Sequence, residues 1–327
     1  MQSGTKYIGG DILMNISYSR FSSYLRCPYA HYLGYIENLK LNRPLRPLQF
    51  GGDFHKLLEM RGDKEKLKLA RKEIEDTFYE LPASWQNDLG ENYLEDLNLI
   101  FGDYQRVYKK ARLPDVTEQK FEIQIGKFKG ESVNFVGIID ELYINDNNKI
   151  SIGEHKTFTQ KPDMTTLHMN TQKCLYAKAV YIQKGILPQE VIWDYIHSRP
   201  AKEPIWLEKS GRFSSAASKD ITPYSWLRGC NRQNIEDEEI RKMCNNYKHN
   251  LSNFYFRVTQ EFHPKMVDSI WDGFSYTCKD IARNGCKNKT KNITRDCHWC
   301  SYKEICNAEM TGGDREYVIK KDYIIKE

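Results

Sequence analysis

Two acidic residues and a lysine fall where a β-hairpin would bring them together. The segment V-G-I-I-D-E-L-Y-I-N-D-N-N-K-I-S-I-G-E-H-K-T, residues 136–157, has two β-rich runs joined by turn-forming residues. A turn centred on Asn147 places Asp140 opposite Glu154, and Lys156 follows Glu154 on the same strand face. Cross-strand Cβ atoms lie about 4.5–5.5 Å apart, so like charges in these positions repel each other. The hairpin therefore predicts a pair of carboxylates that needs a counter-charge.

A divalent cation between the two carboxylates would remove this repulsion. Hard oxygen ligands suit Mg²⁺ or Mn²⁺, with water in the remaining positions. Such a metal polarises a phosphoryl oxygen and generates hydroxide at neutral pH, and Lys156 can position that water or stabilise charge on the phosphate. The alternative is a solvated strand face with ordinary surface charges. The apolar residues that precede the carboxylates on the same face favour the metal site: Val136, Ile138, Ile150 and Ile152.

Nine cysteines form the second group of residues with chemical potential. Cys297, Cys300 and Cys306 form a C-x2-C-x5-C array, whose short first spacing lets two thiolates reach one metal centre. Four thiolates suit either zinc or an iron–sulfur cluster, so the ligand type does not decide between them. The candidates for a fourth ligand are Cys27, Cys278, Cys286 and His298. The other cysteines are expected to be buried thiols: Cys174, Cys230 and Cys244.

The first three regions of the chain would position the carboxylates. Residues 1–60 are expected to be an N-terminal helical segment, with a proline-containing break and a new helix after Gly51 and Gly52. Residues 61–116 are charged, show helical periodicity and indicate a helical insertion. Residues 117–200 are rich in strand patterns and are expected to form the catalytic core.

The rest of the chain would complete this core. One helix is expected at about 164–184, on which Gln172 and Tyr176 are four residues apart and share a face. Residues 201–275 are expected to be a peripheral, mostly helical region, with a helix through 235–256. Residues 276–327 carry the cysteine array and a possible closing strand, R-E-Y-V-I-K-K-D-Y-I-I-K-E.

Composition indicates a globular chain of 327 residues, with 40% hydrophobic residues and a net charge of +5. No segment approaches about 18 uninterrupted apolar residues, so no membrane-spanning helix is expected. The N-terminus lacks the apolar stretch of a signal peptide, and we therefore expect a cytoplasmic protein without a disulfide framework. Residues 279–295 carry six basic residues against one acidic residue. Such a run is either solvated surface or a nucleic-acid contact.

In these residues the chain resembles the PD-(D/E)XK nuclease superfamily. G-I-I-D, thirteen intervening residues and E-H-K are similar to its D…(D/E)-x-K core. Further blocks follow the family order: the cysteine motif Y-S-R-F-S-S-Y-L-R-C-P-Y with Cys27, F-G-G-D-F-H with His55, E-Q-K-F with Glu118, and Q-K-C-L-Y with Gln172 and Tyr176. With the cysteine tail, they resemble the RecB-type branch, which contains the iron–sulfur exonucleases of CRISPR adaptation and the AddB-like proteins of helicase–nuclease recombination complexes.

The resemblance implies a fold and a set of site residues. The fold would be α/β, with a restriction-endonuclease-like mixed β-sheet core flanked by helices, a helical insertion and a C-terminal region that carries an iron–sulfur cluster. The implied catalytic residues are Asp140, Glu154, Lys156, Gln172 and Tyr176. The implied ligands of Mg²⁺ or Mn²⁺ are His55, Asp140, Glu154, the backbone carbonyl of His155, and Glu118, near which Glu122 shares the strand parity. The implied ligands of a [4Fe–4S] cluster, in place of zinc, are Cys27, Cys297, Cys300 and Cys306.

The implied activity is metal-dependent hydrolysis of DNA from an end, on single strands, in recombination, repair, phage DNA processing or CRISPR adaptation. A helicase, integrase or recombination protein would be a partner, and the source would be bacterial or phage. The basic residues expected to contact the DNA backbone are Lys287, Lys289, Lys291 and Arg295. One alternative is an RNA-directed or structure-specific nuclease. The other is a non-catalytic nucleic-acid-binding or scaffold module, against which the complete set of Asp140, Glu154 and Lys156 argues.

Overall fold

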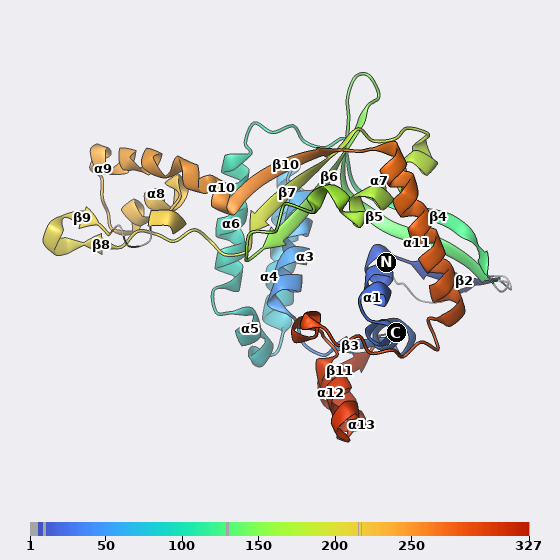
Figure 1. Cartoon of the computed structure of the whole chain (residues 1–327). Coiled ribbons are helices and arrows are strands. Elements are labelled where there is room, and N and C mark those ends of the chain that lie inside the picture. The colour runs from blue at the N-terminus through green and yellow to red at the C-terminus, as the bar shows by residue number, and fades with distance from the viewer. Residues whose placement is uncertain (1–5, 9–10, 129–130, 215, 217, 327) are drawn as a thin grey trace.

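A mixed β-sheet lies at the centre of the computed structural model, which describes all residues except 1–5, 9–10, 129–130, 215, 217 and 327 (Figure 1). The strand order is β1-β2-β5-β6-β7-β10, and β4 pairs with β5 beside this path. The bounds are β1 Lys6–Ile8, β2 Asp11–Ile16, β4 Val116–Phe128, β5 Glu131–Ile144, β6 Ile150–Phe158, β7 Glu190–His197 and β10 Tyr255–Glu261. The expected mixed sheet flanked by helices is confirmed.

The long strand β5 organises the sheet. On one edge it pairs with β4 along nearly its whole length. On the other edge it pairs with two strands, parallel to β2 at Ser132–Phe135 and antiparallel to β6 at Glu141–Ile144. The pairing of Ile144 with Ile150 is the register that the hairpin pattern predicts. Because neither β2 nor β6 pairs with residues 136–140, a gap opens in this edge, and Asp140 lies where β6 leaves β5.

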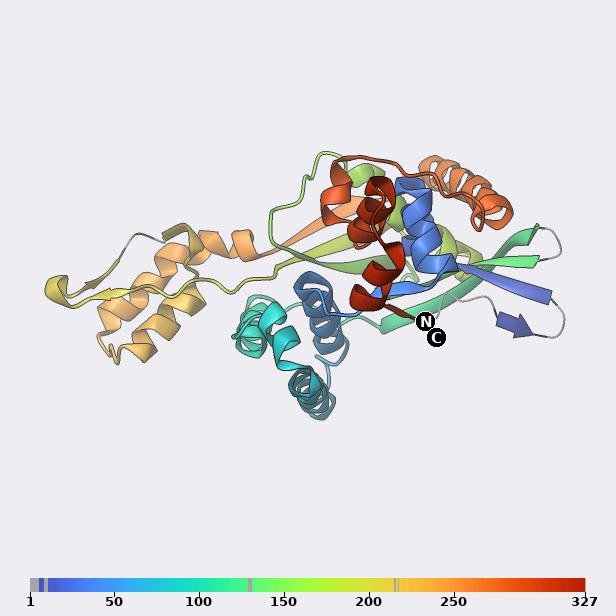
Figure 2. The ribbon, with the colours of Figure 1, turned by 90° about the horizontal axis from the view of Figure 1, so that it is seen from below.

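Helices cover both faces of the sheet, as Figure 2 shows from below. The helices α1 (Tyr18–Arg26), α7 (Thr171–Lys184) and α11 (Pro264–Asn284) pack on one face, in a core that includes Phe21, Leu175 and Phe274. The other face is covered by α3 (Arg46–Glu59), α4 (Lys64–Glu80), α5 (Ala83–Leu89) and α6 (Tyr93–Val107). Their core includes Phe54 and Phe101 and reaches Ile196 of β7.

Two helices begin at residues other than those expected. α7 begins at Thr171 rather than near 164, because the Asn170 side chain accepts a hydrogen bond from the backbone N–H of Lys173 and caps the helix. α3 begins at Arg46, so Gly51 and Gly52 lie inside it rather than before it. A proline is favourable in the first turn of a helix, and Pro47 takes this place.

A projecting arm leaves the sheet after β7 and returns in β10 (Figures 1 and 2). It contains β8 (Trp206–Leu207), β9 (Arg212–Phe213), α8 (Pro223–Arg232), α9 (Glu238–Lys242) and α10 (Leu251–Phe254). It has its own small core around Trp226. The long helix expected over 235–256 is wrong: α9 gives way to the 3₁₀ turn η5 (Met243–Asn250), and the chain is already a strand at Tyr255.

The C-terminal region packs against the segment that follows α1. It contains η6 (Arg295–Trp299), α12 (Lys303–Thr311), α13 (Arg315–Asp322) and β11 (Tyr323–Ile325), and it contacts α2 (Pro28–His31), η1 (Tyr32–Ile36) and β3 (Leu39–Leu41). The expected closing strand is mostly helix, because the Asp314 side chain caps α13; only β11 is extended, and it pairs with β3. Within the described residues, no helix combines the length and apolar character needed to cross a membrane.

Candidate active site

Three neighbouring strands contribute one carboxylate each to a single charged group: Glu118 on β4, Asp140 on β5 and Glu154 on β6. The β4–β5 ladder pairs the residues on either side of Glu118 but omits Glu118 itself. Its φ of 50° is left-handed, which is strained for a residue with a side chain. Strain of this kind is often found where function requires a side chain to point in a particular direction.

The Asp140 carboxylate replaces a rung of the β5–β6 ladder. The last backbone pair joins Glu141 to Gly153, and beyond it the backbone N–H of His155 donates to Asp140 Oδ2 at 2.8 Å. The Asp140 side chain is 14% exposed. Burial raises the pKa of Asp140, and the negative charge of Glu154 raises it further, to about 8. The carboxylate pair expected from the hairpin is therefore partly neutralised by a proton when no cation is bound.

His55 on α3 completes a compact group of ligand atoms with Glu118 and Asp140. One ligand atom of each residue lies within 4.8 Å of the other two, and His55 Nδ1 is 3.6 Å from Asp140 Oδ1. Burial, followed by the nearby charge of His155, lowers the pKa of His55 to about 4, so the ring is neutral and offers a lone pair. A hydrogen bond with the His155 backbone opposes this shift and places that backbone beside the ring.

Glu154 supplies an unpaired acceptor next to this group. Its side chain is only 5% exposed, and its Oε2 is buried without a hydrogen-bond partner among the described residues. The charge of Glu154 acts on both Asp140 and Glu118. A buried carboxylate oxygen without a donor is costly. A donor set of carboxylate oxygens and one imidazole fits Mg²⁺ or Mn²⁺, and such an ion would satisfy the orphaned oxygen.

Lys156 and Gln172 hold the other oxygen of Glu154. Lys156 Nζ donates to Glu154 Oε1 at 2.6 Å, Gln172 Nε2 donates to the same oxygen at 2.9 Å, and Lys156 Nζ also donates to Gln172 Oε1 at 3.2 Å. Burial lowers the pKa of Lys156, but the Glu154 charge outweighs it, so the net pKa is raised and the amine stays charged. Tyr176 lies one turn after Gln172, buried against Phe121 with ring centroids 5.5 Å apart.

The His155 side chain lies in a buried ionic network that the sequence reading did not identify. Its Nε2 is 2.8 Å from Glu141 Oε1, and its Nδ1 is 3.3 Å from Asp194 Oδ2. Burial lowers the pKa of His155, but these two carboxylates raise it to about 10. Arg61 pairs with Glu141, and Arg257 pairs with Asp194 at 2.9 Å. The sequence contains one indication of this network, since Asp194 interrupts the apolar run E-V-I-W-D-Y-I-H.

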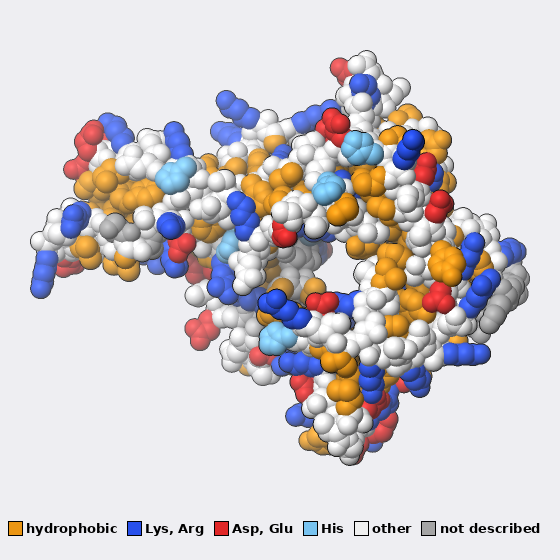
Figure 3. All heavy atoms as spheres, in the orientation of Figure 1, with side chains coloured by type: hydrophobic (Ala, Val, Ile, Leu, Met, Phe, Trp, Pro, Cys, Tyr) orange, Lys and Arg blue, Asp and Glu red, His pale blue; other side chains and the backbone are white. Residues whose placement is uncertain are grey.

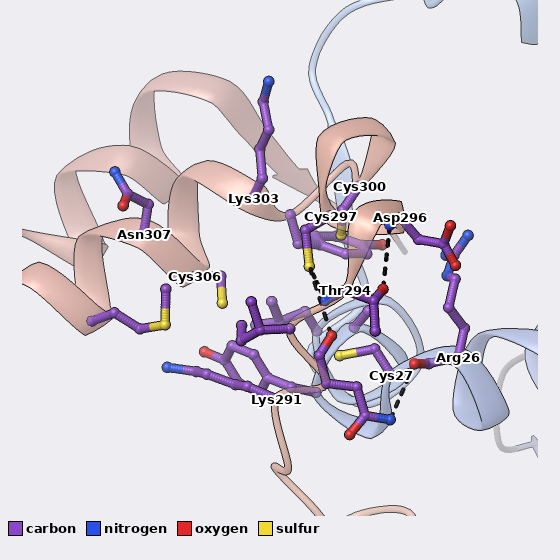
Figure 4. A pocket seen from close by; sticks show the side chains of 17 residues that line it. Arg26, Cys27, Lys291, Thr294, Asp296, Cys297, Cys300, Lys303, Cys306 and Asn307 are labelled. Atoms are coloured by element: carbon purple, nitrogen blue, oxygen red, sulfur yellow. Dashed lines mark hydrogen bonds between the residues drawn. The ribbon is translucent and has the colours of Figure 1, made fainter.

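Four cysteines line a second cavity, of about 130 Å³, between α1 and the C-terminal region. Figure 4 shows Cys27 from the end of α1 opposite Cys297, Cys300 and Cys306. The other candidates for a fourth ligand do not line this cavity: Cys278, which is buried in the core with α11, Cys286, which is exposed, and His298. The structure thus gathers the four thiols that the family resemblance implies, with a space between them.

The basic run passes beside this cavity. Lys287, Lys289 and Arg295 are exposed, and the Lys289 ammonium lies 4.3 Å from the ring centroid of Tyr32. Lys291 is engaged within the fold, since it pairs with Glu309 at 2.8 Å. Three of the four predicted DNA contacts are therefore available on the surface.

Comparison with known proteins places this chain in a family. The model of the PD-(D/E)XK nuclease superfamily matches residues 15–307. The chain belongs to the PD-(D/E)XK nuclease superfamily. A solved structure from Eubacterium rectale, described provisionally as an exonuclease, is 10% identical, covers 86% of each chain and has a TM-score of 0.49. The structure of SSO0001 is 12% identical, covers 94% of this chain and 90% of that chain, and has a TM-score of 0.33. No curated relative matches.

Because both TM-scores are below 0.5, the assignment rests on the family match. The chain is a metal-dependent nuclease with the restriction-endonuclease-like fold of this superfamily. In this PD-(D/E)XK nuclease, the ion would be held by Glu118, Asp140, Glu154 and His55, and it would supply Lewis-acid catalysis and a hydroxide. Lys156 keeps a fixed positive charge beside the carboxylates, where it can stabilise charge that develops on a phosphate.

Asp140→Asn should stabilise the metal-free nuclease at alkaline pH. The pKa of Asp140 is about 8 in the folded chain, whereas the ordinary value of an aspartate in the unfolded chain is 3.8. Between these two pH values the folded state keeps a proton that the unfolded state has released. The stability that this carboxyl group contributes is therefore lost as pH rises from about 4 to 8. An amide does not ionise, and we expect the variant in EDTA to have the higher Tm at about pH 9 and a smaller advantage at about pH 5.

The exposed Asp146→Asn is the matched control and should change the Tm little at either pH. Mn²⁺ should raise the Tm of the wild type but not that of Asp140→Asn, because an amide is a poor replacement for the charged ligand. Parallel pH profiles for Asp140→Asn and the wild type would contradict the buried, proton-sharing site.

Proposed function

We propose that this nuclease is a DNA exonuclease that hydrolyses phosphodiester bonds of single strands with Mn²⁺ or Mg²⁺. The observation that carries the proposal is the orphaned Glu154 Oε2 beside the compact group of His55, Glu118 and Asp140, with the charged Lys156 next to it. A non-catalytic scaffold has no need for a buried acceptor without a donor, or for a strained backbone at Glu118.

The shape of the molecule supports attack from an end. Figure 3 shows an opening between the sheet and the C-terminal region that is closed on all sides in this view, and in Figure 1 the elements α1, α3 and β6 lie around it. A chain end can thread into an opening of this kind, whereas an open cleft also accepts the middle of a strand. Lys287, Lys289 and Arg295 would contact the phosphates, and the resemblance extends the proposal to a helicase, integrase or recombination protein as partner.

A [4Fe–4S] cluster is proposed for the cavity between the four cysteines. Four thiols make a soft donor set, which suits iron–sulfur clusters and zinc alike. A single zinc ion with Zn–S bonds of about 2.3 Å fills the space between its ligands. Among the described residues, no three of these sulfur atoms lie within 4.8 Å of one another, whereas two sulfur ligands of one zinc ion are at most about 4.6 Å apart, so the spacing favours the larger group.

Removing either central carboxylate should abolish cleavage. Asp140→Ala and Glu154→Ala each remove an oxygen ligand from a site with few protein ligands, and both should be inactive on end-labelled single-stranded DNA with Mn²⁺ while remaining folded. Lys156→Met keeps much of the side chain's packing but removes the charge, and kcat should fall about 100- to 1,000-fold with DNA affinity little changed.

The matched control is Glu122→Ala, which removes a carboxylate four residues after Glu118 on β4. Glu122 accepts a hydrogen bond from Asn134 instead of joining the ligand group. It should retain activity, whereas Glu118→Ala should not. Wild-type cleavage by Asp140→Ala would show that the catalytic site lies elsewhere.

Cys27→Ser should remove the cluster as completely as Cys300→Ser. Metal binding contributes folding free energy only when all ligands converge, so the N-terminal ligand counts as much as those of the tail. Anaerobically purified wild type should be brown with about four iron atoms per chain, and both variants should lose colour and iron. The exposed Cys286→Ser is the control and should keep both. Zinc without iron in protein reconstituted with both metals, or full iron in Cys27→Ser, would refute this assignment.

A further inference from the structure

A third cavity lies beside α3, apart from both the carboxylates and the thiols. Its volume is about 410 Å³, and it is formed where the β3–α3 connection, α5 and the C-terminal region meet, near the labels β3, α5 and β11 of Figure 1. Gln49 and Gly52 of α3 form part of its wall. Gly52 precedes His55 by three residues, which is an advance of about 4.5 Å along the helix on a similar face. The cavity therefore begins close to the proposed metal group.

The charged side chains that line this cavity are all positive. Lys40 and Arg43 line it, and no aspartate or glutamate is among its lining residues. Both cations are exposed, and neither is paired with a carboxylate anywhere in the part of the chain that the structure describes. Arg61 and Arg257, by contrast, are paired with Glu141 and Asp194. Two unpaired cations on one wall indicate an anionic occupant.

The other walls of the cavity are aromatic and apolar. Trp85 of α5 and Tyr302 contribute rings, and Leu48 lies at the edge with 72% of its surface exposed. A half-buried indole next to unpaired cations offers both a stacking surface and phosphate contacts, which together are typical of single-stranded nucleic-acid sites. A small anion would use the cations alone, and an acidic peptide would have no use for the position next to His55.

We propose that this cavity binds the single strand next to the scissile bond, with an unpaired base stacked on Trp85 and its phosphates on Lys40 and Arg43. The inference rests on the proposed function and adds the basis of strand specificity. A base can lie flat on the indole only when it is not paired, so a duplex cannot occupy the cavity. Tyr302 lines this cavity as well as the thiol cavity, and it follows Cys300 closely; the cysteine region therefore shapes one wall of the strand site.

The test separates the strand site from the metal site by substrate size. The full-length protein with Mn²⁺ is assayed on a single-stranded oligo-dT substrate and on bis-p-nitrophenyl phosphate, a phosphodiester without nucleotides on either side of the scissile bond. Trp85→Ala should lower kcat/KM on oligo-dT by about 10- to 100-fold, the usual effect of losing one stacked base. Hydrolysis of the small diester should be unchanged, which also shows that the variant is folded. Trp85→Phe should restore most of the loss.

The cations are tested by salt dependence in EDTA, where no cleavage occurs. Removing two phosphate contacts with the double variant Lys40→Ala, Arg43→Ala should make the slope of log K against log salt shallower by about 1.4, since each single-strand contact contributes about 0.7. The matched control removes Lys209 and Arg212 from the tip of the arm and should leave the slope unchanged.

The outcomes distinguish the two proposals. If the wild type hydrolyses neither substrate, the proposed function fails, and the binding slope in EDTA still tests the cavity. If the wild type cleaves oligo-dT and Trp85→Ala cleaves it equally well, the strand site is refuted while the nuclease assignment stands. An unchanged salt slope in the Lys40 and Arg43 double variant would refute the phosphate contacts.

Discussion

The proximity of three carboxylates, of which Glu154 is buried and Glu118 and Asp140 are half-buried, is the constraint on which the rest of the structure depends. Like charges in a largely apolar sheet repel each other and are poorly solvated, so the neighbouring residues must offset their charge. Asp140 retains a proton, Lys156 and Gln172 hold one oxygen of Glu154, and the other oxygen is left for a cation. Without a cation the site therefore has excess negative charge and one oxygen without a partner, and a divalent ion would supply both the positive charge and the missing contact.

The opposite face of the same strand carries the compensating positive charge. His155 lies between Glu141 and Asp194, and these carboxylates hold Arg61 and Arg257 in turn. Arg61 follows α3, which carries His55, and Arg257 belongs to β10, so the network ties the helical layer and the far strand to one segment of β6. A buried network of this kind adds little net stability, but breaking it leaves uncompensated charge, and it therefore fixes the geometry.

The sequence predicts the local part of this arrangement and little of the long-range part. The β5–β6 register follows from the turn and the alternation of apolar residues, and the family motifs single out His55 and Gln172. The partners of His155 are not predictable in this way, because Asp194 and Arg257 reach it only through strand pairing across the sheet. The helix α13 was not predicted from the sequence, because its β-rich composition indicated a strand and only one capping residue, Asp314, indicated a helix. The cavity beside α3 is lined by residues from three separate segments of the chain, so no local sequence pattern predicts it.

The pairing of β3 with β11 has a consequence for how the protein is made on the ribosome. Leu41 pairs with Tyr323, about 280 residues later in the chain. At translation rates of about 5–20 residues per second, the early strand waits roughly 15–60 s for its partner. Throughout that interval β3 lacks its strand partner, and Cys27 is without the three cysteines that line the same cavity. The segment around Cys27 and β3 is thus exposed to mispairing and oxidation until the C-terminal region has been made, and early association with a chaperone would protect it.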